Sequence, residues 1–109
     1  MNWSVKFLPE ADRDMDKLSR AEQCMVRKAI QKVRQNPLPQ SEGGYGKPLG
    51  HKRGLNLVNL LKIKLLGSGI RIVYKVVKTE AEMRVIVVGI REDEEVYALA
   101  QARRDKHKL

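Results

Sequence analysis

The middle of the sequence carries a series of cationic side chains with no acidic residue among them. Between Gly43 and Thr79 there are eight lysines and arginines and no Asp or Glu: Lys47, Lys52, Arg53, Lys62, Lys64, Arg71, Lys75 and Lys78. Both flanking parts of the chain have nearly balanced charge. Cations without a neighbouring acid attract an external polyanion, and nucleic acid is the leading candidate. A membrane surface is less favoured, because these residues do not fall on an amphipathic helix.

Other residue types that support chemistry have simpler explanations in this sequence. The two histidines, His51 and His107, and the single cysteine, Cys24, are too few for a Cys/His zinc site. The four acids at residues 92–95 fit the start of a helix, where the helix dipole favours negative charge, better than a magnesium site. Residues 43–47 lack the spacing of a P-loop. We therefore expect no metal and no cofactor.

The length and composition of the chain indicate a small, basic, folded protein. Its 109 residues fit a single domain over residues 1–109, and 42% hydrophobic residues are enough for a packed core. The formal net charge is +9. No segment approaches the roughly 20 apolar residues of a membrane span, and residues 1–6 lack the apolar segment of a signal peptide. We expect a cytoplasmic protein without a membrane partner.

The first part of the chain predicts a strand followed by a helical hairpin. Residues 3–7 alternate apolar and polar side chains, as a half-buried strand does. Pro9 suits the first position of a helix, and Ser19 and Glu22 form a capping-box sequence that begins a second helix. The apolar positions of that helix follow the helical period: Met25, Val26, Ala29, Ile30 and Val33.

The rest of the chain predicts a loop, three strands and a last helix. Residues 37–56 are rich in Gly and Pro and indicate a long surface loop. Residues 58–66, 70–77 and 84–90 are rich in Val, Ile and Leu, and their short connections predict an antiparallel three-strand meander. Residues 92–95 begin the last helix, with Val96, Leu99 and Ala100 on one face. Residues 103–108 form a basic tail that we expect to be solvated, with contact to ribosomal RNA as the alternative.

Four of the cations are expected on one face of the meander. Period-2 alternation separates the cations Lys62, Lys64, Arg71 and Lys75 from the core side chains Leu61, Ile63, Leu65, Ile70, Ile72, Tyr74 and Val76. If the connecting loop has two residues, Lys64 and Arg71 share a face and pair directly or diagonally. Such residues can simply be the solvated face of a half-exposed sheet. Like charges on neighbouring strands are destabilising, however, and this cost favours a functional role.

Three segments of the second half resemble the RelE-type toxins of bacterial toxin–antitoxin pairs. These segments are residues 61–65 (LKIKL), 68–74 (SGIRIVY) and 88–97 (VGIREDEEVY). The resemblance implies an α+β, RelE-like fold with an N-terminal strand, a two-helix hairpin, an antiparallel three-strand meander that completes a curved sheet, and a C-terminal helix. It also implies a toxin that contacts mRNA and ribosomal RNA in the ribosomal A site and cuts the mRNA there without a metal. A cognate antitoxin would neutralise it, in a complex that binds operator DNA through the antitoxin.

The same resemblance implies five catalytic residues: Lys62, Lys64, Arg71, Arg91 and Tyr97. Attack by a 2′-hydroxyl needs a base, cations for the charge on the phosphorane, and an acid or cation for the leaving 5′-oxygen. We assign phosphate and transition-state binding to the two arginines, which stay charged, and proton transfer to the two lysines and the tyrosine, without choosing the base. The predicted RNA contacts outside this set are Lys47, Lys52, Arg53 and Lys75.

At Ile90 and Asp93 the sequence departs from members of the family, which often carry more basic residues there.

Two other classes of function remain open at this stage. A ParE-like toxin would share the fold and inhibit DNA gyrase through protein contacts, but it is expected to lack the five residues named above. A basic RNA-binding module without activity is compatible with the composition alone. Cleavage of mRNA on programmed ribosomes distinguishes the three.

Overall fold

The computed structural model of the protein describes residues 2–52, 54–90 and 92–109. In chain order its elements are β1 (Ser4–Phe7), α1 (Pro9–Asp16), α2 (Arg20–Val33), the short helix η1 (Gln40–Glu42), β2 (Lys47–Lys52), β3 (Leu55–Leu65), β4 (Ile70–Val77), the short helix η2 (Lys78–Glu80), β5 (Glu82–Gly89) and α3 (Asp93–His107). The α+β class and the order of the predicted elements are confirmed.

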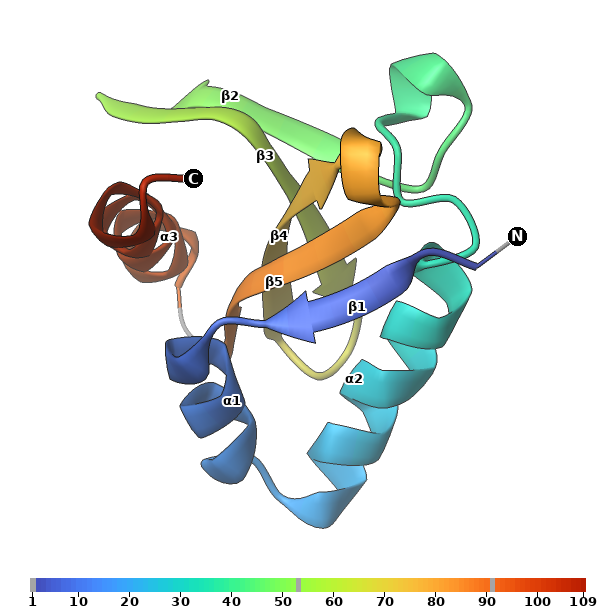
Figure 1. The fold of residues 1–109 in the computed structure, drawn as a ribbon. Helices are drawn as coiled ribbons and strands as arrows, with labels where there is room; N and C mark the ends of the chain where they lie inside the picture. Colours follow the sequence, from blue (N-terminus) through green and yellow to red (C-terminus); the bar gives the residue numbers. More distant parts are fainter. Residues whose placement is uncertain (1, 53, 91) are drawn as a thin grey trace.

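The described strands form one sheet in the order β1-β5-β4-β3-β2. β1 pairs with β5 in parallel, and the other neighbours are antiparallel. Figure 1 shows α2 and α3 on opposite sides of this sheet, and α3 packs on β3, β4 and β5. β5 buries four successive side chains, from Val85 to Val88, so its two faces both belong to the core. A strand that is covered on both faces usually has an unbroken run of apolar residues in its sequence, as residues 85–88 do.

The helical hairpin begins and turns as its sequence predicts. The Ser19 hydroxyl accepts a hydrogen bond from the Glu22 amide at 3.1 Å, and the Glu22 carboxylate accepts one from the Ser19 amide at 2.9 Å. The capping box is therefore confirmed. Met25 is 40% exposed, in contrast to its predicted place on the buried face. Among the described residues no helix is long and apolar enough to cross a bilayer.

The prediction of a long surface loop over residues 37–56 is wrong. This segment contains η1 and β2, and β2 pairs antiparallel with β3, which begins at Leu55 rather than at residue 58. Glycine allows the pairing: Gly50 has a φ of +62° beside an irregularity in register, and Gly54 has a φ of +80° between the two strands. The Gly and Pro content thus marks a bulge and a tight turn. The predicted three-strand meander is extended by a fourth antiparallel strand.

The connection between β3 and β4 also differs from the expectation. Leu65 is paired with Ile70, so four residues connect the strands instead of two. A four-residue loop and a two-residue loop both leave Lys64 and Arg71 on the same face of the sheet, because successive side chains alternate between the two faces. Lys64 is therefore paired directly with Arg71, as predicted. The loop requires left-handed backbone at Gly67 (φ +85°) and Gly69 (φ +75°), and the Ser68 hydroxyl donates to the Leu65 carbonyl at 3.1 Å.

The cationic face of the sheet is not simply solvated. Val73, which shares the side-chain parity of Arg71 and Lys75, is fully buried, and α3 packs on this strand. The sequence indicated that Tyr97 of the last helix could approach this face, but not that the helix would cover β3, β4 and β5. The cations are therefore found around the margin of α3 instead of on an open sheet face.

The expectation of a solvated tail over residues 103–108 holds for Asp105, Lys106 and Lys108, which are exposed, and is wrong for Arg103, Arg104 and His107, which are partly buried. α3 continues to His107, and Arg103 makes two hydrogen bonds to the Asp14 carboxylate, at 2.6 and 3.2 Å. Arg104 donates to the carbonyls of Asn56 and Val58. The His107 ring lies 3.0 Å from both carboxylate oxygens of Glu10, and this hydrogen bond lowers the pKa of Glu10 to about 2. Polar contacts thus fix the end of α3 to α1 and β3.

Replacing Asp14 should destabilise the fold, because Asp14→Asn removes the charge that binds Arg103. We expect the free energy of unfolding to fall by about 2–3 kcal/mol in urea denaturation, as for the loss of one partner of a largely buried ion pair. Asp16→Asn, at an exposed carboxylate of the same helix, is the matched control and should change stability by less than about 0.5 kcal/mol. Equal effects of the two variants would show that the Asp14 ion pair does not anchor α3.

Candidate active site

One pair of predicted catalytic residues joins the sheet to the last helix. Lys62 lies on β3, and its ammonium group donates a hydrogen bond to the Tyr97 hydroxyl of α3 at 3.3 Å. The same nitrogen lies 5.9 Å from the centroid of the Tyr97 ring. Tyr97 is 6% exposed, since it packs with Val96 and Ala100 on the buried face of α3. The phenol is therefore held in a fixed place beside a cation.

A second pair lies across the β3–β4 hairpin. Lys64 and Arg71 are direct cross-strand partners, and the Arg71 side chain is 17% exposed. Arg71 donates from one terminal guanidinium nitrogen to the Gly69 carbonyl at 3.0 Å and from Nε to the carboxylate of Asp93. Hydrogen bonds from two directions fix the plane of this guanidinium, as bidentate binding of a phosphate requires.

Asp93 connects the two pairs electrostatically. It is the first residue of α3, and its side chain is 41% exposed. Burial acts to raise the pKa of Asp93, but the hydrogen bond and charge of Arg71, together with the charges of Lys64 and Lys62, outweigh it and hold that pKa below its usual value. The carboxylate thus stays ionised and partly neutralises the surrounding cations.

The structure therefore brings together four of the five predicted catalytic residues. We call Lys62, Lys64, Arg71 and Tyr97 the cationic cluster. The fifth predicted residue, Arg91, lies outside the described residues. In the sequence Asp93 is visible only as a departure from the family pattern, and its contact with Arg71 was not predicted. A signal was present, because an acid that begins a helix just after the strand next to Arg71 falls close to that arginine.

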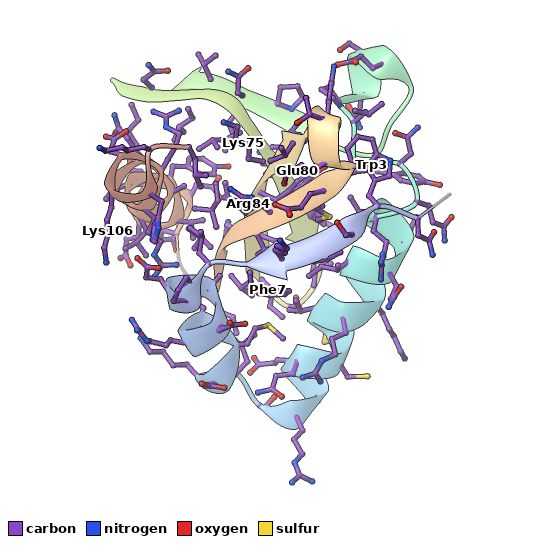
Figure 2. All side chains as sticks on the ribbon, in the orientation of Figure 1. Trp3, Phe7, Lys75, Glu80, Arg84 and Lys106 are labelled. Atoms are coloured by element: carbon purple, nitrogen blue, oxygen red, sulfur yellow. The ribbon has the colours of Figure 1, made fainter. Side chains whose placement is uncertain are left out.

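The four predicted RNA contacts are separated by the fold. Lys47 lies on β2 directly opposite Lys62, so it is next to the cationic cluster and not in a loop. Lys75 is paired with Arg84, and Figure 2 shows these two side chains near Glu80. Along β4, Lys75 lies four residues beyond Arg71 of the cationic cluster. Lys52 is the last residue of β2, and Arg53 lies outside the described residues.

The groups of the cationic cluster are suited to bind an anion and to transfer a proton to it. Arg71 supplies a permanently charged donor, the two ammonium groups supply further donors, and the phenol of Tyr97 is able to give or take a proton. His107 lies at the opposite end of α3 with Glu10. Among the described residues no group of three or more His, Cys, Asp or Glu side chains is arranged to hold a metal ion.

Comparisons with known proteins agree with this arrangement. No family model matches the chain. A curated Escherichia coli protein, a RelE-like toxin protein, is 35% identical over 104 residues, which cover 94% of this chain and 98% of that protein. A doubly substituted E. coli toxin RelE in the free state is 29% identical, with a TM-score of 0.71 over 94% of this chain and 98% of that one.

Two solved toxin–antitoxin complexes contain a similar chain. A chain of the intact E. coli RelBE complex is 27% identical, with a TM-score of 0.63 over 83% of this chain and 98% of that one. A chain of the RelBE2 complex of Mycobacterium tuberculosis is 21% identical, with a TM-score of 0.67 over 84% of this chain and all of that one, and it supports the fold alone. On the identity and coverage of its curated relative, this chain belongs to the family of RelE-like toxins.

Proposed function

We propose that this protein is the toxin of a type II toxin–antitoxin pair and an endoribonuclease that cuts mRNA in the ribosomal A site. The observation that carries the proposal is the cationic cluster, in which Arg71 is fixed beside Lys64 while Lys62 donates to the phenol of Tyr97. These groups supply the cations and the proton-transfer groups that cleavage of RNA without a metal requires.

The proposed reaction is an attack of the 2′-hydroxyl on the neighbouring phosphorus. The new bond forms between the 2′-oxygen and phosphorus, and the bond from phosphorus to the 5′-oxygen breaks, which leaves a 2′,3′-cyclic phosphate and a 5′-hydroxyl. One proton leaves the 2′-hydroxyl for a base, and one proton reaches the departing 5′-oxygen. Arg71 stabilises the charge on the phosphorane, and the proton transfers belong to Lys62, Lys64 and Tyr97.

The cationic cluster is too open to hold a flexible RNA strand in position without a further partner, and the ribosome is the partner that we propose. Lys64 is exposed to solvent, and the cluster lies at the margin of α3 and not in a deep cleft. Fixing a flexible RNA strand for in-line attack is worth several kcal/mol of the barrier. We propose that the ribosome supplies this positioning, so that free RNA is cut far more slowly than ribosome-bound mRNA.

An antitoxin is the second proposed partner. The formal net charge of +9 favours rapid association with an acidic protein. The solved relatives include complexes of a RelE toxin with its antitoxin. We propose that the cognate antitoxin covers cationic and apolar surface of this chain and that the complex reaches operator DNA through the antitoxin.

Replacing Arg71 tests the reaction. On ribosomes programmed with mRNA, Arg71→Ala should lower the single-turnover cleavage rate by roughly two orders of magnitude, because the arginine stabilises charge that develops in the transition state. Lys78→Ala is the matched control, an exposed cation directly after the same strand and away from the cationic cluster, and it should keep the rate of the chemical step. If Arg71→Ala cuts at the wild-type rate, the proposed site is wrong, and if the wild type leaves ribosome-bound mRNA intact, the nuclease function is wrong.

Replacing Tyr97 separates the role of the hydroxyl from that of the ring. Tyr97→Phe keeps the packing of the ring on α3 and removes the group that accepts from Lys62. If the phenol transfers a proton or binds phosphate, Tyr97→Phe should lose roughly two orders of magnitude in single-turnover rate, nearly as much as Tyr97→Ala. An active Phe variant beside an inactive Ala variant would assign only orientation to the ring, and proton transfer would then belong to the lysines.

Replacing Asp93 tests the balance of charge at the cationic cluster. Asp93→Asn keeps an acceptor for Arg71 but removes the negative charge, so it should bind a short oligoribonucleotide about two- to fivefold more tightly in fluorescence anisotropy. Asp93→Ala also releases Arg71 and should cut ribosome-bound mRNA about tenfold more slowly than Asp93→Asn. Equal cleavage by the two variants would mean that Asp93 does not position the arginine.

A further inference from the structure

A groove extends from the cationic cluster toward α2. It runs between α2 and the strands β2 and β3, has a volume of about 550 Å³, and ends at the exposed Leu66 of the β3–β4 loop. Two residues of the cationic cluster, Lys62 and Lys64, line this groove as well. A cavity of this size holds a ligand as large as a nucleotide.

The groove is strongly cationic. Its charged lining residues are all lysines: Lys28 and Lys32 from α2, Lys47 from β2, and Lys62 and Lys64 from β3. No described acidic residue lines it, and Lys28, Lys32 and Lys47 form no ion pair with any described residue. Five lysines along one groove repel one another, and a bound polyanion relieves that repulsion.

An aromatic ring stands at the rim of the groove on a rigid segment. Tyr45 is 47% exposed, and the ammonium group of Lys32 lies 5.5 Å from the centroid of its ring. The Tyr45 amide donates to the Asn36 carbonyl at 3.0 Å. The next residue, Gly46, is packed so closely against the hydroxyl of Tyr74 that a Cβ atom would lie 2.4 Å from it. The ring is therefore presented to solvent by a backbone that cannot easily move.

We propose that this groove binds the single-stranded RNA next to the scissile bond, with one base stacked on Tyr45 and the phosphates on Lys28, Lys32 and Lys47. Stacking on an exposed aromatic side chain between cations is the usual way in which proteins bind single strands without reading their sequence. The apolar floor, which includes Ala29 and Ile63, also suits the faces of bases. This inference rests on the proposed function and extends its site to α2 and to the segment before β2.

The continuity of the groove with the cationic cluster favours RNA over an acidic peptide. Lys62 and Lys64 belong to the cluster and also line the groove, so an RNA strand with one phosphate at the cluster can continue past β3 into the groove. An acidic peptide would satisfy the lysines, but it would not need the exposed aromatic ring of Tyr45. The test therefore includes a peptide arm.

The affinity of full-length variants for a fluorescein-labelled oligouridine, measured by anisotropy at several salt concentrations, tests this inference. Tyr45→Ala should bind at least fivefold more weakly, and Tyr45→Phe should bind like the wild type because it keeps the ring. Lys28→Gln should reduce the slope of log affinity against log salt by about 0.7. Lys108→Gln, at an exposed lysine beyond the end of α3, is the charge-matched control and should change the slope far less. Tyr45 and Lys28 are exposed, and thermal melting should verify that these variants fold.

The outcomes for the groove and for the nuclease are separable. If the wild type cuts ribosome-bound mRNA while Tyr45→Ala and Lys28→Gln bind RNA like Lys108→Gln, the groove is not an RNA site and the proposed function survives. If these variants lose RNA affinity while the wild type cuts nothing, the groove binds RNA and the nuclease function fails. If a glutamate-rich peptide binds in a Tyr45-dependent manner and oligouridine does not, the groove is a peptide site and this inference is overturned.

Discussion

The position of α3 on the sheet depends on one largely buried carboxylate, that of Asp14. It accepts two hydrogen bonds from Arg103 and one from the Val88 amide, so it joins α1, β5 and α3. α3 itself buries few apolar side chains, and contact with the sheet alone would orient it weakly. A desolvated carboxylate is stable only with its lone pairs occupied, which fixes the directions of its partners. The opposite end of the same helix then carries Tyr97 to Lys62 and Asp93 to Arg71.

The sheet tolerates repulsion between like charges on β2, β3 and β4 because burial of β4 and β5 supplies its stability. Lys64 lies opposite Arg71, and Lys47 lies opposite Lys62, and each like-charge pair is unfavourable. β4 and β5 supply the compensating burial, since both strands are covered on their two faces. Asp93 offsets only part of the charge. The excess positive charge is thus retained at the expense of stability, which is the physical argument for an anionic ligand.

The sequence predicted what depends on local pattern and missed what depends on tertiary contact. The strand β4 has the predicted bounds, 70–77, because apolar and polar residues alternate between clear turn signals. The pairing of Lys64 with Arg71 followed from side-chain parity, although the loop is longer than expected. β2 was missed because its Gly and Pro residues have low strand propensity, and only pairing with β3 makes it a strand. The contact of Arg103 with Asp14 spans 89 positions in the chain and has no local signature.

In the proposed function, β3 lies between the reacting groups of the cationic cluster and the groove that binds the RNA strand. On one side Lys62 meets the phenol of α3, where the reacting groups lie, and on the other side the strand forms a wall of the groove toward α2. Asp93 lowers the affinity of the cationic cluster for a phosphate, because part of its charge is already neutralised. A substrate held along the groove needs little affinity at the cluster itself, since binding energy from remote groups is available to position the scissile bond. The segment before β2 supplies Tyr45, and the first residue of β2 is Lys47. Neither this segment nor β2 was predicted from the sequence, and together they most directly determine how firmly a strand is held.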